Sequence, residues 1–351
     1  GPYPFRKEKY GHVMFARGGG MEHQTMSFMG TLNFDLMAHE LGHMWFGDKI
    51  TCASWQDLWL NEGWATYSNV LAHELVKGRD SYLEFVRFQK SRVLDEDDGS
   101  VYAYDTADRA DLFSGRLRYG KGAMVLHQLR WTVGDSAFFE GTRNYMANAD
   151  YCYGFAHTID FQEAIEEASG VDLDGFFERY IYQEGYPILT STWRRINPVQ
   201  IGINVLQNTS LSSVSFYPMK IQYLAIGDER DSLITIDHAQ SGAEVLVDVG
   251  FAVRDLVFDP NEWILGRSIV LEGDHSDISA IAIYPNPSTS STSVYMQDKK
   301  MDRIEIVDAQ GRVMQEKEVF ELKGVPTQLD LRGIASGVYF VKIYAGDESW
   351  V

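Results

Sequence analysis

Two histidines spaced four residues apart, His39 and His43, carry the strongest chemical signal in this sequence. They stand in the run His-Glu-Leu-Gly-His, within a segment whose apolar residues recur at helical spacing. Residues four apart lie on one face of a helix, so both imidazoles can bind one metal ion. A catalytic zinc needs a third protein ligand and keeps one position open for water. Glu62 is the candidate, because the intervening segment 44–61 is long enough to end one helix and begin a facing one.

A carboxylate directly after the first histidine completes a possible hydrolytic site. Glu40 is placed to take a proton from zinc-bound water. A chance H-E-x-x-H in a chain of this length is roughly a one-in-a-hundred event, and requiring Glu62 as well makes it roughly one in a thousand. The alternative is a helix with two polar surface histidines and a buried glutamate. We therefore predict one zinc ion per chain, bound by His39, His43 and Glu62, with Glu40 as general base.

An α-rich segment over residues 1–188 must position these side chains. Apolar spacing predicts helices over residues 35–46, 57–75, 80–94, 122–133, 136–149 and 161–182. From residue 189 to 270 the period falls to two, and Ile201, Ile203 and Val205 share one face of a predicted strand. A polar linker over residues 271–279 leads to a second β-unit over residues 280–351. The predicted fold class is therefore a multidomain α+β protein, with a mostly α domain followed by two β-sandwiches.

Composition limits the function classes further. The 351 residues include 50 acidic and 31 basic side chains, which gives a formal net charge of −19. Nucleic acid and anionic membranes are poor partners for such a chain, and no apolar run reaches the roughly 20 residues of a membrane-spanning helix. Cys52 and Cys152 could form one disulfide or remain two free thiols. The first residues show no signal peptide, and we expect the sequence to be a piece of a longer polypeptide.

An H-E-x-x-H motif followed by a glutamate at this interval resembles the signature of the gluzincin metallopeptidases related to aminopeptidase N and leukotriene hydrolase. Residues 19–24, Gly-Gly-Met-Glu-His-Gln, resemble that family's G-A-M-E-N strand. In the family, the strand's glutamate binds the free α-amino group of the substrate and its backbone pairs with the peptide. The resemblance therefore implies that Gly20, Met21 and Glu22 bind substrate.

A second motif extends the resemblance. Tyr119 begins the run Tyr-Gly-Lys-Gly, which resembles the family's Y-x-K-G, whose tyrosine stabilises the tetrahedral oxyanion. The resemblance spans residues 1–188 and implies a thermolysin-like zinc aminopeptidase domain acting on peptides with a free N-terminus. Chemistry agrees, since Glu22 could hold an ammonium group by charge-assisted hydrogen bonds and Tyr119 could donate to an oxyanion without carrying charge.

The sequence departs from the family pattern in two ways. His23 replaces the usual asparagine, and it could hydrogen-bond a peptide backbone, bind zinc or alter specificity. The family's N-terminal β-domain and large C-terminal helical domain are missing from this sequence, so we expect a more open pocket. Two other function classes stay open, which are a zinc endopeptidase or epoxide hydrolase on the same fold, and a surface adhesion protein with a non-catalytic zinc. Glu22 favours the aminopeptidase, and Glu40 argues against a purely structural zinc.

The segment over residues 280–351 resembles something else. A Tyr-Pro-Asn-Pro run at 284–287, an Asp-Ala-Gln-Gly-Arg turn at 308–312 and a Leu-Arg-Gly-Ile-Ala-Ser-Gly-Val-Tyr run at 331–339 are similar to the C-terminal sorting domain of type IX secretion cargo. That resemblance implies an Ig-like sandwich recognised by outer-membrane secretion machinery, and hence a secreted or outer-surface bacterial protein. The alternative is a generic carbohydrate-binding or adhesion module.

Overall fold

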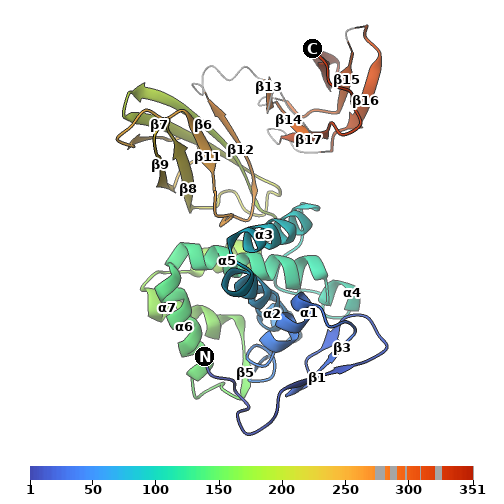
Figure 1. Cartoon of the computed structure of the whole chain (residues 1–351), viewed down its shortest axis with the longest axis vertical. Helices are drawn as coiled ribbons and strands as arrows, with labels where there is room; N and C mark the ends of the chain where they lie inside the picture. Colours follow the sequence, from blue (N-terminus) through green and yellow to red (C-terminus); the bar gives the residue numbers. More distant parts are fainter. Residues whose placement is uncertain (273–280, 285–290, 297–298, 309, 321–325, 351) are drawn as a thin grey trace. The chain divides into compact units, whose positions relative to one another are not determined.

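The computed structural model describes residues 1–272, 281–284, 291–296, 299–308, 310–320 and 326–350 (Figure 1). The chain divides into two compact units, which are described separately. The first comprises Gly1–Pro187, Leu211–Lys220 and Asp259–Arg267, and the second comprises Ile188–Ser210, Ile221–Phe258 and Ser268–Val351. Two connections from beyond residue 188 thus belong to the mainly helical unit.

A small sheet opens the first unit. Its strands β1 (Gly11–Met14), β2 (Gly20–Met21) and β3 (Met26–Met29) lie in the order β1-β3-β2, with β1 parallel and β2 antiparallel to β3. The helix α1 (Phe34–Gly42) follows β3. Asn33 caps this helix by accepting a hydrogen bond from the backbone N–H of Leu36 at 2.8 Å, a typical start for a short helix.

Helix α2 (Trp59–Ala72) is the centre of the first unit. Most of its residues are buried, including Trp59, Trp64 and Tyr67, and they lie on all faces of the helix. This is expected for a helix enclosed by other elements. It packs against α1 and α5 (Gly122–Val133), and Figure 1 shows it among the other helices. The unit also contains a 3₁₀ turn at Trp55–Asp57, the pair β4 (Ile50–Cys52) and β5 (Gly154–Ala156), α3 (Arg79–Leu94), α4 (Arg109–Leu112), α6 (Asp135–Ala147), α7 (Thr158–Ser169), α8 (Asp174–Phe177), and π-helical segments at His73–Lys77, Gly115–Lys121 and Glu178–Tyr182.

The largest differences between the helices and the sequence-based ranges lie at two places. The helix predicted over residues 35–46 ends at Gly42. The one predicted over residues 161–182 is interrupted, because Gly170 adopts a left-handed conformation with φ of 68° and ends α7. Helix α3 and helix α5 agree with their predicted ranges to within a residue.

Glycines allow the helices around α2 to approach closely. A Cβ at Gly42 would lie 2.7 Å from Oγ of Ser68, so α1 and α2 cross where only a hydrogen fits. A Cβ at Gly63 would lie 3.1 Å from Cα of Gly122, and a Cβ at Gly122 would lie 3.1 Å from Cα of Gly63. These two contacts bring α1 and the start of α5 against α2.

The second unit consists of β-strands. Strands β6 (Pro187–Asn197), β7 (Gln200–Thr209), β10 (Glu244–Asp248) and β12 (Arg267–Glu272) form one sheet in the order β10-β7-β6-β12, and β8 (Met219–Ile226), β9 (Asp231–His238) and β11 (Asp255–Phe258) form another in the order β11-β8-β9. Ile201, Ile203 and Val205 of β7 are all buried. The shared face predicted for these three residues is confirmed.

The C-terminal part of this unit forms two further sheets. Their orders are β13-β14-β17 and β16-β15-β18-β19, from strands Ile281–Tyr284, Ser291–Met296, Arg303–Val307, Val313–Glu318, Thr327–Asp330, Phe340–Ala345 and Glu348–Trp350, numbered β13 to β19 in chain order. In the turn at 308–312, Asp308 accepts hydrogen bonds from the N–H groups of Gln310 and Arg312. Residues 285–287 of the Tyr-Pro-Asn-Pro run and 273–279 of the predicted linker lie outside the described residues.

Two further sequence questions receive an answer. Within the described ranges, no helix combines the length and the apolar character needed to cross a membrane. Cys52 and Cys152 are both free thiols, so of the two possibilities left open the structure contains no bridge between them.

Candidate functional site

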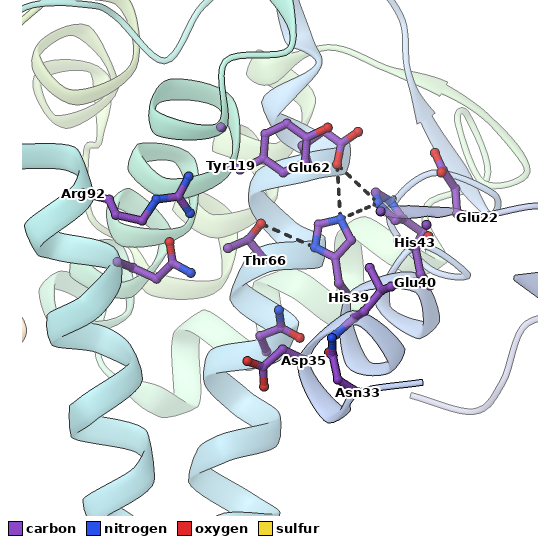
Figure 2. A pocket seen from close by; sticks show the side chains of 16 residues that line it. Glu22, Asn33, Asp35, His39, Glu40, His43, Glu62, Thr66, Arg92 and Tyr119 are labelled. Atoms are coloured by element: carbon purple, nitrogen blue, oxygen red, sulfur yellow. Dashed lines mark hydrogen bonds and ion pairs between the residues drawn. The ribbon is translucent and has the colours of Figure 1, made fainter. Parts of the chain in front are cut away.

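A cavity of about 530 Å³ lies in the first unit, on the side of α1 and α2 that faces β2 and α3. Figure 2 shows the side chains that line it. The lining residues come from several elements and are mostly polar: Gly19, Gly20, Glu22, Asn33, Asp35, Leu36, His39, Glu40, His43, Glu62, Thr66, Asn69, Gln89, Arg92, Gly115 and Tyr119.

His39, His43 and Glu62 converge at the centre of this cavity. The Nε2 atoms of the two histidines are 3.1 Å apart, and Oε2 of Glu62 lies 3.4 Å from the first and 3.3 Å from the second. Two ligands that are each about 2.0–2.1 Å from a tetrahedral zinc ion stand about 3.3 Å from one another. The three donor atoms therefore have the spacing of a zinc site.

The environment of these side chains also suits a cation. Oε2 of Glu62 is buried and has no hydrogen-bond partner among the described residues. Although burial opposes ionisation, the adjacent imidazoles of His39 and His43 hold the pKa of Glu62 at about 2. A buried, ionised carboxylate between two imidazoles is a donor set that zinc commonly uses.

Neighbouring groups orient the two imidazoles. Nδ1 of His43 donates to the carbonyl oxygen of Phe46 at 3.0 Å, so Nε2 carries the lone pair when the ring is neutral. Nδ1 of His39 lies 3.5 Å from Oγ1 of Thr66. The carbonyl of Phe46 is available because α1 has already ended at Gly42.

Glu40 lies beside the ligand set. Its side chain is buried, and Oε2 has no hydrogen-bond partner in the described chain. Burial raises the pKa of Glu40 to about 7, and the charges of Glu22 and Glu62 act in the same direction. Oxygen atoms of Glu22 and Glu40 and a ring nitrogen of His43 lie within 4.8 Å of one another. Gly20 makes this arrangement possible, since a Cβ there would lie 2.1 Å from Oε1 of Glu40.

Tyr119 stands on another side of the ligand set. Its ring stacks on that of His39, with centroids 5.8 Å apart and planes inclined by 12°. Burial, reinforced by the charge of Glu62, raises the pKa of Tyr119 far above its usual range, so the phenol stays protonated and can donate. The contact between Gly63 and Gly122 brings the segment that carries Tyr119 against α2.

Three cationic side chains fasten the π-helical segment Gly115–Lys121 that carries Tyr119. Arg116 donates to the carbonyl of Asp98 at 2.9 Å, and Lys121 donates to the carbonyl of Gly99 at 2.6 Å. Arg118 donates to the carbonyl of Ser100 at 2.7 Å. Three successive backbone carbonyls of one loop thus each accept a hydrogen bond from a cationic side chain of this helical segment. No sequence motif predicted this arrangement.

The structure brings most of the predicted site residues to one cavity. Gly20, Glu22, Glu40 and Tyr119 line it with the three candidate ligands, whereas Met21 is 40% exposed and does not line it. The ring of His23 contacts that of Phe28, and no described cluster suited to a metal includes it.

Several lining residues were not predicted from the sequence. Thr66 and Asn69 lie four and seven residues after Glu62 on α2, and Gln89 and Arg92 lie three residues apart on α3. Counting helical spacing onward from Glu62 would have found the first two. No sequence pattern indicates that Gln89 and Arg92 line the cavity, because this depends on how α3 packs against the rest of the unit.

Comparison with known proteins identifies the class to which this fold and site belong. Residues 10–180 match the peptidase family M1 domain, and residues 282–351 match the secretion system C-terminal sorting domain. The chain therefore contains a peptidase family M1 domain, followed by a secretion system C-terminal sorting domain. The resemblances stated from the motifs are confirmed.

Individual relatives agree with this assignment. Probable M1 family aminopeptidase 1 of Encephalitozoon cuniculi is 32% identical over 196 residues, covering 53% of this chain and 21% of that protein. Aminopeptidase N of Streptomyces lividans is 36% identical over 160 residues, covering 43% and 18%. The structure of Legionella pneumophila aminopeptidase A in complex with aspartic acid shares the mixed α+β fold, with a TM-score of 0.61 and 20% identity over 76% of this chain and 32% of that one. The chain spans about a fifth of the length of these two sequence relatives.

Proposed function

We propose that this protein is a zinc-dependent aminopeptidase that removes N-terminal residues from peptides. The observation that carries the proposal is the spacing of 3.1–3.4 Å among the donor atoms of His39, His43 and Glu62, with Glu40 and Tyr119 beside them. One zinc ion per chain would be held by these three residues. When bound, the ion polarises the scissile carbonyl and lowers the pKa of a water molecule.

The remaining residues have distinct roles in this proposal. Glu40 accepts the proton of the attacking water and returns it to the leaving amine. Tyr119 donates its phenol proton in a hydrogen bond to the oxyanion. Glu22 binds the free ammonium group of the substrate, while the strand around Gly20 and Met21 pairs with the peptide backbone. Because the Glu22 carboxylate binds the ammonium group of the first residue, cleavage is restricted to the bond that follows that residue.

The proposal includes a domain layout and a destination. We place a thermolysin-like catalytic domain at residues 1–188, a β-sandwich at 189–270, a linker at 271–279 and an Ig-like sorting domain at 280–351. The sorting-domain match supports export by type IX secretion machinery to the medium or the outer surface. Deleting residues 280–351 should abolish export in the native host and leave hydrolysis unchanged, and undiminished secretion would contradict this part.

The test of the activity compares aminoacyl chromogenic substrates and short peptides with free and acetylated N-termini. Acetylation removes the charge-assisted hydrogen bond to Glu22, so kcat/KM should fall roughly tenfold to a hundredfold or more. Glu22→Ala should lose a similar factor on free-amine substrates and much less on acetylated ones. Glu8→Gln, at an exposed glutamate that does not line the cavity, is the matched control. Equal cleavage of both substrate forms would indicate an endopeptidase instead.

Metal analysis separates the ligands from the base. His43→Ala should lose the zinc, whereas Glu40→Gln should retain it and lose turnover by about 10²–10⁴-fold. Stoichiometric zinc in the His43→Ala variant would exclude this metal site. Near-normal turnover of zinc-loaded Glu40→Gln would exclude Glu40 as the base.

A further inference from the structure

Arg92 lines the cavity without a carboxylate partner. It is the one lysine or arginine among the described cavity-lining residues, and no described carboxylate lies within ion-pair distance of its guanidinium. Its guanidinium lies 5.7 Å from the ring of Phe88 and beside Gly115, where a Cβ would lie 3.1 Å from Nη2. In a chain with 50 acidic and 31 basic residues, an arginine left without a carboxylate in a cavity can receive an external anion.

Neighbouring cations do have partners. On α3, Arg87 and Lys90 both pair with Glu262, each at 2.8 Å. On the π-helical segment, Arg118 pairs with Asp111 at 2.8 Å. Asp35, the acidic lining residue toward that end of the cavity, pairs with His73 at 3.0 Å. Unlike these three cations, Arg92 has no carboxylate partner among the described residues.

Two buried amide side chains near Arg92 have unused acceptors. Asn69 and Gln89 are 6% and 5% exposed, and both line the cavity. Oδ1 of Asn69 and Oε1 of Gln89 have no hydrogen-bond partner in the described structure. A buried acceptor without a donor is costly, and the N–H groups of a peptide would satisfy both.

Arg92 and Glu22 lie on opposite sides of the ligand set. Figure 2 shows Glu22 on one side of His39, His43 and Glu62, and Arg92 on the other side. If Glu22 binds the substrate ammonium and the scissile carbonyl lies at the ligand set, the leaving portion of the peptide extends toward Arg92. This step rests on the proposed function.

We propose that Arg92 binds a carboxylate on the leaving portion of the substrate, with Asn69 and Gln89 accepting hydrogen bonds from its backbone. The enzyme would then favour short peptides, whose terminal carboxylate comes within reach of the guanidinium. An aspartate or glutamate side chain at the same distance offers the same chemistry. A guanidinium binds a carboxylate through two parallel N–H···O bonds, which makes such a contact specific.

The test compares peptide acids with their amides. Let X be the N-terminal residue that is cleaved best from chromogenic substrates. X-Ala and X-Ala-Ala are compared with their C-terminal amides, and X-Glu-amide and X-Ala-Glu-amide test the side-chain source. For at least one acid, kcat/KM should exceed that of its amide by roughly tenfold to a hundredfold. Arg92→Gln should reduce the acid to the rate of the amide and leave the amide within about twofold.

Two controls make the outcome decisive. Arg87→Gln changes another arginine of α3 that does not line the cavity and should preserve the preference for the acid. Arg92→Lys should restore part of it, since the charge remains without the two-pronged geometry. Equal losses on acid and amide in Arg92→Gln, or no preference by the wild type at any length, would overturn the proposal.

Binding measurements separate this inference from the proposed activity. Zinc-loaded Glu40→Gln protein can be titrated with the same acids and amides without turnover. The acid should bind roughly ten times more tightly or better, and adding Arg92→Gln should remove that difference. If chromogenic substrates are not hydrolysed but this difference persists, the proposed function fails and the carboxylate site stands. If they are hydrolysed and no difference is found, the carboxylate site fails alone.

Discussion

Replacing Gly20 by alanine tests whether the position of Glu40 is essential. Gly20 lies on β2, which pairs with β3, and a Cβ there would lie 2.1 Å from Oε1, 2.4 Å from Cδ and 2.8 Å from Cγ of Glu40. Real Cβ contacts below 3.0 Å are essentially never found. The carboxylate would therefore have to move by about 1 Å.

The structure indicates how large the effect should be. Glu40 is only 3% exposed, so it can give way only by leaving its present position or by pushing β2 outward. A misplacement of about 1 Å at a reacting group can cost about 10²-fold in rate. We therefore expect Gly20→Ala to lower kcat about a hundredfold. Zinc content should stay at the wild-type value, because the close contacts of this Cβ are with Glu40 and not with the ligands.

Gly18→Ala is the matched control for this substitution. A Cβ at Gly18 would meet nothing within 4 Å, and its φ is not in the positive range. Turnover of a chromogenic substrate, zinc content and thermal denaturation should be measured for both variants. A folded, zinc-loaded Gly20→Ala protein with kcat within threefold of wild type would refute the argument. Loss of zinc along with activity would show that the effect does not act through Glu40.

Three further substitutions test the framework of the site. Lys121→Met should lower kcat roughly tenfold with little change in KM, because the Gly99 carbonyl loses its donor and the segment with Tyr119 is released; a proportional change in KM would contradict this. Gly63→Ala should cost about 1–3 kcal/mol in urea denaturation, since its Cβ meets Gly122 at 3.1 Å. Asp57→Ala should cost about 3 kcal/mol at pH 7, because Asp57 accepts hydrogen bonds from Ser54, His157 and Thr158. Those bonds overcome the cost of burial and lower the pKa of Asp57. The difference in unfolding free energy from wild type should therefore be full above about pH 4 and shrink as the pH falls through the lowered pKa. A difference that does not depend on pH would exclude the carboxylate as its source.

The candidate ligands could be predicted because their geometry is local. The interval between His39 and His43 is about one helical turn, and the position of Glu62 requires only that the next helix face the first. The end of α1 at Gly42 was harder to predict from the sequence, because it depends on the crossing of α1 with α2 at Ser68. The break at Gly170 was missed for another reason, since apolar spacing continues through a glycine that adopts a left-handed conformation.

Residues that depend on packing between distant segments could not be predicted. Arg116, Arg118 and Lys121 share one helical segment, but the carbonyls that they bind belong to a separate loop, at positions 98–100 of the chain. Arg92 could not be predicted either, because the sequence does not show which exposed arginine of α3 borders the cavity.

The motif glycines explain why the predicted residues come together at all. Gly63 directly follows the candidate ligand Glu62, and Gly122 ends the run that begins at Tyr119. The contact between these two glycines leaves no room for a side chain on either. Gly42 directly precedes the candidate ligand His43, and its contact with Ser68 likewise leaves no room for a side chain. A ligand beside a close helix contact has little freedom to move, because shifting it would require separating two helices of the core. The rigidity that a zinc site needs thus comes from small residues adjacent in sequence to the ligands, and substitutions at those glycines should loosen the site without removing a ligand.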